Sequence, residues 1–241
     1  MTSERKTEQQ PPGLVENPQE GVMPDEIALA AMLIDRMSKK LEVYGDTDDE
    51  FVVRLRQIKE LSGLQDGAEV IYPGSSTHVG VARVFGKEHV THVDPDEKAM
   101  VAMSDAGYLT ETCTIEDYRP EQPADAIIAL NSYGKPTQEL IGALVRPGGI
   151  VVANNHTHWA AALNEQEGLT LMGAIFPNYY GPDAKLLSPG EVPEGACEIA
   201  KAFYIIGKGG RVTMGSPDHY TFMDDEPRYP DALFIFQRQQ A

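Results

Sequence analysis

Apolar and polar positions follow two different patterns along the chain. Before residue 64, apolar side chains recur every three or four positions, and this spacing predicts two amphipathic helices. The first begins at Pro24 and ends near Gly45, and the second begins at Asp48 and ends before Gly63. Beyond residue 68, short continuous apolar runs alternate with helical stretches, as in sheets whose strands are buried on both faces.

These apolar runs are the predicted strands. They lie at residues 70–71, 89–93, 112–115, 125–130, 150–153, 169–176 and 232–236. Predicted helices begin after Gly74, at Pro95, at Pro136 and at Trp159, and they separate most of the runs. Strands joined by helices lie parallel, with helices on both faces and ligands at the carboxyl ends of the strands. We therefore expect an α/β fold with a doubly wound, mainly parallel sheet.

Two segments lack both patterns. Residues 1–23 are polar, contain proline and show no periodicity, so we expect a flexible tail. Residues 178–230 hold several X-Pro pairs around the strand-like run 202–206, and we expect a long irregular insertion before the last strand. The expected organisation is a single domain over residues 24–241 that begins with the helices of residues 24–63.

Charge and cysteine usage narrow the classes of partner. The chain has 37 acidic and 20 basic side chains, a net charge of −17, and would repel a long phosphate backbone. We therefore expect no nucleic acid partner. Cys113 and Cys197 lie far apart without metal-type spacing, and the sequence shows neither an apolar leader nor about 18 continuous apolar residues. These features indicate a cytoplasmic protein with reduced thiols and no membrane partner.

A small-residue turn follows the first predicted strand. Pro73 ends the strand, and Gly74 can adopt a backbone conformation that a Cβ atom would forbid. Ser75, Ser76 or Thr77 can then cap the next helix. Such a turn presents backbone N–H groups at the positive end of a helix, where a nucleotide or another polar ligand can bind.

Acidic residues follow the second and third predicted strands. Asp94 lies twenty residues after Gly74, the spacing at which an acidic residue binds a ribose in dinucleotide-binding folds. Asp94 can also cap the helix that begins at Pro95, and the two roles are compatible. Glu116 and Asp117 form either a solvated turn or a contact with the base of a nucleoside.

A polar and aromatic cluster, residues 154–159, follows the strand at 150–153. Its position at the carboxyl end of a strand indicates a functional role. His156 and His158 have no identifiable third or fourth partner for a metal ion, so we expect no metal site. His156 is instead a candidate for acid-base catalysis or substrate contact, since an imidazole titrates near neutral pH. Trp159 fits a place in the core equally well.

The order of these elements resembles the class I S-adenosylmethionine-dependent methyltransferases. The resemblance covers roughly residues 48–176 and the last strand, and residues 145–149, Val-Arg-Pro-Gly-Gly, are its best local match. In that family an acidic residue and Gly-x-Gly-x-Gly follow the first strand. Here Tyr72 stands in place of the acid, and Gly74, Ser76 and His78 occupy the glycine positions.

The resemblance implies S-adenosylmethionine as cofactor, S-adenosylhomocysteine as by-product, and a small molecule or an exposed protein side chain as methyl acceptor. Residues 131–133, Asn-Ser-Tyr, are similar to the Asn-Pro-Pro-Tyr motif of methyltransferases that act on amino groups. The implied cofactor contacts are Gly74, Ser75, Ser76, Asp94, Glu116 and Asp117. The implied acceptor contacts are Asn131, Tyr133, Asn155 and His156.

Two other functions fit parts of the sequence. Tyr72 and His78 favour a non-catalytic, methyltransferase-like protein that binds a nucleoside or a protein partner. A dinucleotide-binding oxidoreductase is disfavoured because the spacing from Gly74 to Gly80 does not fit Gly-x-Gly-x-x-Gly.

Overall fold

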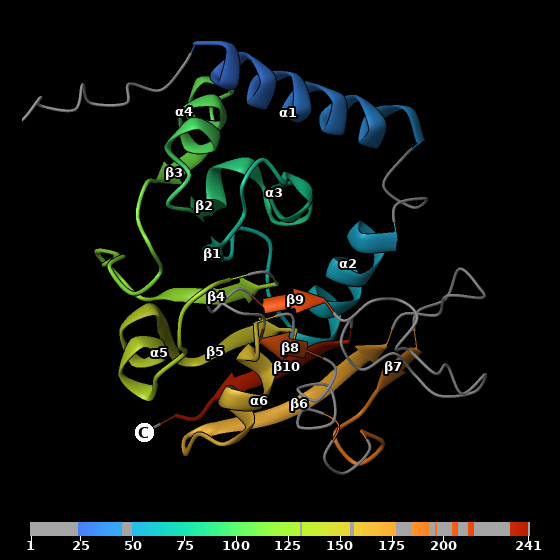
Figure 1. Ribbon diagram of the computed structural model, residues 1–241. Helices are drawn as coiled ribbons and strands as arrows, with labels where there is room; N and C mark the ends of the chain where they lie inside the picture. The colour runs from blue at the N-terminus through green and yellow to red at the C-terminus, as the bar shows by residue number, and fades with distance from the viewer. Residues whose placement is uncertain are drawn as a thin grey trace, which may run out of the picture.

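One eight-stranded sheet organises the computed structural model (Figure 1). The structure describes residues 24–44, 50–130, 132–154, 157–176, 185–192, 196, 204–206, 212–214 and 232–240. The strands follow the order β3-β2-β1-β4-β5-β10-β6-β7 across the sheet. Their bounds are β1 Val70–Pro73, β2 Val90–Val93, β3 Leu109–Glu111, β4 Ala124–Ala129, β5 Val145–Ala153, β6 Leu169–Phe176, β7 Lys185–Leu187 and β10 Leu233–Arg238.

The first five strands are parallel to one another where they pair, and β10 is antiparallel to both of its neighbours, β5 and β6. Strand β1 pairs with β2 on one side and with β4 on the other, so the strand order reverses beside β1. In open α/β sheets the carboxyl ends at such a reversal form the ligand-binding edge. The predicted doubly wound, mainly parallel sheet is confirmed.

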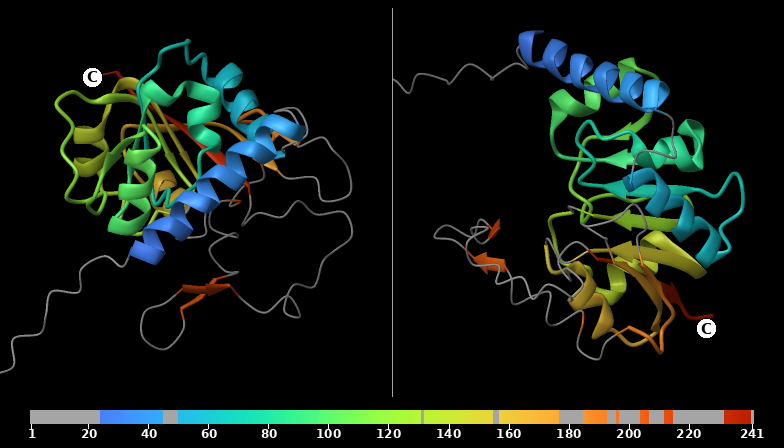
Figure 2. Two further views of the ribbon diagram at one scale, coloured as in Figure 1. Left: turned by 90° about the horizontal axis from the view of Figure 1, so that it is seen from above. Right: turned by 90° about the vertical axis from the view of Figure 1, so that its right-hand side faces the viewer.

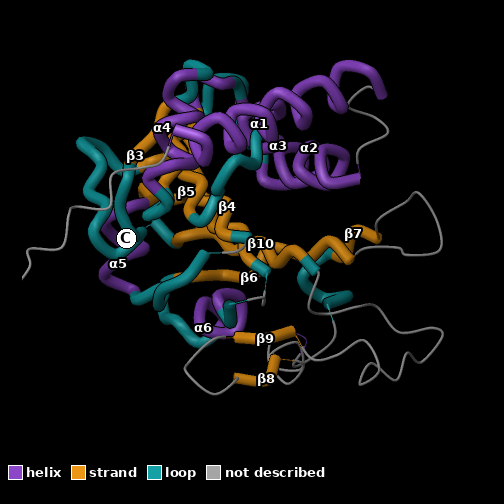
Figure 3. The backbone as a smooth tube through the Cα atoms, turned by 45° about the horizontal axis from the view of Figure 1, so that its top comes forward, coloured by secondary structure: helices purple, strands orange, loops and turns teal. Residues whose placement is uncertain are grey.

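Helices cover both faces of the sheet (Figure 2). Helices α1 to α4 lie on one side of the strands, and α5 and α6 lie on the other (Figure 3). Alternate side chains of each strand enter the two layers: Val70 and Tyr72 pack with α2 and α3, whereas Ile71 packs with α5. The helices are α2 Glu50–Ser62, α3 Gly80–Phe85, α4 Glu97–Asp105, α5 Gln138–Leu144 and α6 Trp159–Asn164, with the 3-10 turn η1 at Lys87–His89.

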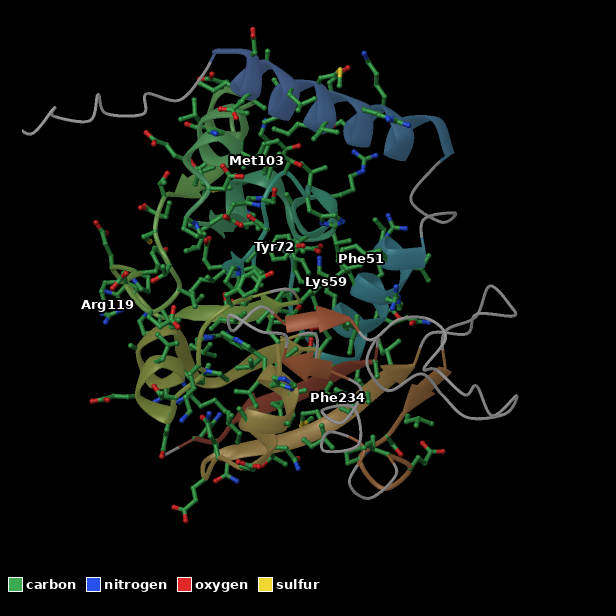
Figure 4. All side chains as sticks on the ribbon, viewed as in Figure 1. Phe51, Lys59, Tyr72, Met103, Arg119 and Phe234 are labelled. Carbon is green, nitrogen blue, oxygen red and sulfur yellow. The ribbon has the colours of Figure 1, made fainter. Side chains whose placement is uncertain are left out.

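Helix α1, Pro24–Tyr44, confirms the predicted N-terminal helical extension and packs against α4. Ala30 and Ile34 share a buried cluster with Met100 and Met103, and Figure 4 labels Met103 beneath α1. Burial of Ile34, Met100 and Met103 in this cluster stabilises the fold by about 1.5 to 3 kcal/mol for each side chain. The extension is therefore part of the domain and supports the elements around β2.

Two local predictions are wrong. The third strand runs from Leu109 to Glu111, not over residues 112–115, and Cys113 lies beyond it. This strand is at the edge of the sheet and pairs only with β2, so it does not require a continuous apolar run. The strand predicted at residues 150–153 begins earlier, at Val145, so that the Arg-Pro-Gly-Gly segment lies inside β5, as an irregularity in its pairing with β4.

The long connection between β6 and β10 is described only in part. It contributes β7 to the edge of the main sheet, and β8, Tyr204–Ile206, pairs antiparallel with β9, Val212–Met214. The remainder of the predicted insertion at 178–230, and the predicted tail at 1–23, lie outside the described residues. Among the described helices, none is long and apolar enough to cross a membrane.

Candidate functional site

The turn after β1 lies beside the end of β2, as its sequence position predicts. Gly74 has φ +64°, and its N–H donates to the carbonyl of Val93 at 2.9 Å. Ser76 also has a positive φ, +44°. Helix α3 begins only at Gly80, after Val79 as N-cap, and no side chain caps it. The prediction that Ser75, Ser76 or Thr77 caps this helix is wrong, because the chain makes an additional turn, from the carbonyl of Ser75 to the N–H of His78, before the helix starts.

Asp94 joins this turn to the loop after β2. Its Oδ2 accepts the backbone N–H of Ser76 at 2.8 Å, and its Oδ1 accepts the N–H of Asp96 at 2.9 Å. The residue is only 8% exposed. It does not cap α4, because Asp96 accepts the N–H groups of Lys98 and Ala99 and is the cap. Asp94 and the Gly74 turn are thus held together by a buried, charge-assisted hydrogen bond.

Aromatic rings lie next to the turn. The hydroxyl of Tyr72 is 3.1 Å from Nδ1 of His78, and Phe51 meets the same imidazole edge-on (Figure 4). Burial, together with the negative charge of Asp94, raises the pKa of Tyr72 far above its usual value. Tyr72 is therefore a neutral phenol at physiological pH. The position that carries the acid in the resembling family has no charge here.

His92 extends this ring cluster. It is fully buried between Tyr72 and Tyr108, with ring centroids 5.6 Å from each. Burial, followed by the charge of His78, lowers its pKa from 6.5 to about 4. Within the described part of the chain, neither ring nitrogen of His92 has a hydrogen-bond partner. A neutral imidazole is thus part of the core beneath the turn.

The turn after β4 is the second polar feature of this edge. Gly134 has φ +109°, and Tyr133 before it is 77% exposed. Oε1 of Glu116 accepts the N–H of Lys135 at 3.1 Å, and the indole N–H of Trp159 donates to the carbonyl of Gly134, also at 3.1 Å. Asn131, predicted to contact the acceptor, lies outside the described residues.

The loop after β3 carries the two predicted base contacts. Glu116 and Asp117 are both exposed, and Oδ2 of Asp117 accepts the hydroxyl of Thr114 at 2.9 Å. Glu116 contacts the turn after β4 across the loop, as described above. The loop therefore lies beside the carboxyl end of β4.

The segment after β5 is described at its two ends. Asn154 is buried, and its carbonyl accepts the N–H of Ala160 at 3.2 Å. His158 has φ +64° and precedes α6, where Trp159 is fully buried. Asn155 and His156, the predicted acceptor and acid-base residues, lie outside the described residues. Among the residues that the structure does describe, no group of three or more His, Cys, Asp or Glu side chains could hold a metal ion.

Sequence reasoning missed the contacts of Glu116 and Trp159 with the turn after β4. A partial signal is present in the sequence: Gly134 ends a polar turn, and a buried tryptophan needs a partner for its indole N–H. Nothing in the sequence pairs residues 159 and 134, because the contact depends on the packing of α6 against β5 and β6.

A surface hollow of about 420 Å³ lies elsewhere, at the end of α2 that leads into the start of β1. Its lining is Arg56, Lys59, Glu60, Gly63, Leu64, Gln65 and Val84. Because it lies towards the amino ends of the strands, it is separate from the candidate site.

Comparisons with known proteins give structural matches alone. No protein-family model and no curated protein sequence matches the chain. Among solved structures, it is similar to the 16S rRNA methyltransferase RmtF in complex with S-adenosyl-L-homocysteine, with 12% identity over 89% of this chain and 76% of that one and a TM-score of 0.47. It is also similar to the N-methyltransferase NodS from Bradyrhizobium japonicum WM9 with the same ligand, with 13% identity, 66% and 98% coverage and a TM-score of 0.42.

A third similar structure, a putative methyltransferase from Thermoplasma acidophilum, has 16% identity, 74% and 70% coverage and a TM-score of 0.41. The assignment of fold rests on the sheet itself, with its reversal of strand order beside β1 and its antiparallel last strand. The chain has the class I methyltransferase-like α/β fold that the sequence predicts.

Proposed function

We propose that this protein transfers a methyl group from S-adenosylmethionine to a small molecule or to an exposed protein side chain, with S-adenosylhomocysteine as by-product. The observation that carries the proposal is Asp94, a buried carboxylate at the end of β2 that also holds the turn after β1. An acid in this place, next to a glycine turn at the reversal of strand order, suits the hydroxyl groups of a ribose.

The proposed cofactor lies along the carboxyl ends of β1, β2 and β3. Gly74, Ser75 and Ser76 would contact its amino-acid part, and Asp94 would bind its ribose. The loop that carries Glu116 and Asp117 would contact the base. The proposed acceptor contacts, from the turns after β4 and β5, are Asn131, Tyr133, Asn155 and His156.

The chemistry requires little covalent help from the protein. A lone pair of the acceptor attacks the methyl carbon, the bond from carbon to sulfur breaks, and its electron pair remains on sulfur, which becomes a neutral thioether. The protein must hold the acceptor in line with the methyl group and exclude water. An amine or hydroxyl acceptor loses a proton, and His156 is the proposed group that takes it.

Calorimetric titration tests the cofactor. S-adenosylmethionine and S-adenosylhomocysteine should bind, whereas NAD and NADP should not. Asp94→Ala should weaken binding by about 1 to 3 kcal/mol, because charge-assisted bonds to the ribose are lost. Asp96→Ala is the matched control, since it removes a neighbouring carboxylate that caps α4. Binding that is equal in the two variants would refute the ribose role of Asp94, and failure of both S-adenosyl compounds to bind would refute the function.

The pair of Tyr72 and His78, which stands where the resembling family has an acid and a glycine, supports one alternative, a non-catalytic protein that binds a nucleoside or a partner. On this alternative, nucleosides would bind without any methyl transfer. Incubation with labelled S-adenosylmethionine and mixtures of amines, hydroxyl compounds and proteins distinguishes the two, since incorporation of label requires the enzyme.

A further inference from the structure

The backbone of the turn after β4 is held by three side chains that come from outside it. Glu116 comes from the loop after β3, Trp159 begins α6, and Gln166 follows α6. They hydrogen-bond to three consecutive residues, Lys135, Gly134 and Pro136 respectively. Each contact is made to main-chain N–H or carbonyl groups, so it fixes the path of the turn whatever side chains the turn carries.

The carboxylate of Glu116 lies very close to the backbone of Gly134 in this turn. A Cβ atom at residue 134 would collide with the carboxylate of Glu116, which would then have to leave its present position. The φ of +109° at Gly134 also favours glycine. The same oxygen accepts the N–H of Lys135. The carboxylate, the glycine and the next N–H therefore form one fitted unit.

Trp159 holds the other side of the turn. Its ring is fully buried, and its indole N–H donates to the carbonyl of Gly134. A tryptophan side chain has two rotatable bonds, so a buried one loses little entropy when it makes such a bond. Because Trp159 directly follows the segment at 154–158, it joins the chain that leaves β5 to the chain that leaves β4.

We propose that Glu116 and Trp159 are positioning residues that fix the turn after β4 against the segment after β5 and so set the place of the exposed ring of Tyr133. This inference rests on the proposed function in one respect, that this turn faces the methyl acceptor. Glu116 is then not a ligand of the nucleoside base, and Asp117 is the carboxylate of that loop which contacts the base. A displacement of about 1 Å at an acceptor contact can cost about a hundredfold in rate.

Amide hydrogen exchange at Lys135 tests the positioning role directly. Glu116→Ala removes the acceptor of this N–H, so exchange should become about five- to tenfold faster. Glu116→Gln retains an acceptor oxygen and should restore exchange to within about twofold of the wild type. Glu121→Ala, an exposed carboxylate later in the same loop, is the control and should change nothing. Unchanged exchange in Glu116→Ala would overturn the proposal.

The single tryptophan of the chain supplies a second measurement. Loosening of the turn in Glu116→Ala should admit water to the indole N–H and shift the emission of Trp159 to longer wavelength, whereas Glu116→Gln and Glu121→Ala should keep the wild-type spectrum. An unshifted spectrum in Glu116→Ala would contradict the linkage of Glu116 and Trp159 through the turn.

Titration with S-adenosylhomocysteine separates this inference from the proposed function. Glu116→Ala should bind it within about twofold of the wild type, because the residue acts on the acceptor side. A loss of tenfold or more, with Lys135 exchange unchanged, would make Glu116 a base ligand and overturn the inference. If the wild type binds no S-adenosyl compound, the proposed function fails, and the exchange and emission results still decide whether Glu116 positions the turn.

Discussion

The turns after β1 and after β4 are each held by a carboxylate that accepts a backbone N–H from the turn. Asp94 holds Ser76 at 2.8 Å, and Glu116 holds Lys135 at 3.1 Å. Asp94 is buried, whereas Glu116 is exposed to solvent. A buried hydrogen bond to a charge contributes more than an exposed one, which competes with water and is screened by salt. The hydrogen bond of Asp94 therefore stabilises the fold at the first turn, whereas the hydrogen bond of Glu116 mainly sets the local geometry of the second.

The surroundings of the two turns also differ in burial. Tyr72, His78 and His92 form a largely buried ring cluster beside the first turn, in which Tyr72 and His92 are neutral at physiological pH. The second turn displays the ring of Tyr133 to solvent. On the proposed function, the first turn would recognise the cofactor, and the second would meet an acceptor that arrives from solution.

The largest expected effect is a loss of stability in acid that originates beneath the first turn. The pKa of His92 is lowered from 6.5 to about 4 in the folded protein, so the unfolded chain takes up the proton at higher pH. Stability contributed by the neutral ring is present above about pH 6.5 and is lost as the pH falls towards about 4, by roughly 3 kcal/mol. Urea unfolding across this range measures it.

His92→Phe is the control for this effect, since it keeps a ring against Tyr72 and Tyr108 and removes the titrating group. The variant should lose less stability over the same pH range than the wild type. If the free energies of unfolding of the variant and the wild type fall in parallel with pH, titration of His92 does not weaken the region of the first turn. The proposed difference in stability between the two turns would then not include His92.

The next effect compares the two carboxylates. Asp94→Ala should lower the free energy of unfolding by about 2 to 3 kcal/mol, because two hydrogen bonds to a buried charge are lost. Glu116→Ala should lower it by less than about 1 kcal/mol, because its bond is exposed. Chemical denaturation of both variants checks the difference. Equal losses would show that burial does not separate the two turns.

The smallest expected difference in stability is between alanine variants of the two turn glycines, Gly74 and Gly134. Gly74→Ala should cost about 1 kcal/mol, the usual penalty of a left-handed conformation. Gly134→Ala should cost about 2 kcal/mol, since its φ lies further from that region and the new Cβ would meet Glu116. Thermal unfolding of both variants measures the costs. Addition of Glu116→Ala to Gly134→Ala should recover the part due to collision, and no recovery would place the whole cost in the backbone.

The regular part of the fold follows from the sequence because each central strand is buried on both faces and so shows a continuous apolar run. Val70 and Ile127 mark such strands. The role of Asp94 at a ribose, inferred from its spacing to Gly74, stays a prediction. The edge strand at Leu109–Glu111 is missed because β2 is its one partner among the described strands and because the side chains of Leu109 and Glu111 are exposed.

The details of the site are less predictable, since they depend on which side chain reaches which backbone group. Asp94 and Asp96 both fit a helix cap by sequence, and only the direction of the chain after β2 decides that Asp96 is the cap. The contact of Trp159 with Gly134 spans 25 positions, and it results from packing that no local pattern records. Tyr133 is predicted at the site, yet its high exposure is visible only in the structure.

The position of β10 has a consequence for how the protein is made. This last strand, Leu233–Arg238, lies between β5 and β6 and pairs with both. During synthesis, β5 and β6 leave the ribosome long before their shared neighbour exists, so each presents an open edge that can pair with another chain. The sheet can close only after β10 has been synthesised. Chaperone demand, and losses to aggregation, should therefore concentrate in the interval between translation of β6 and translation of β10.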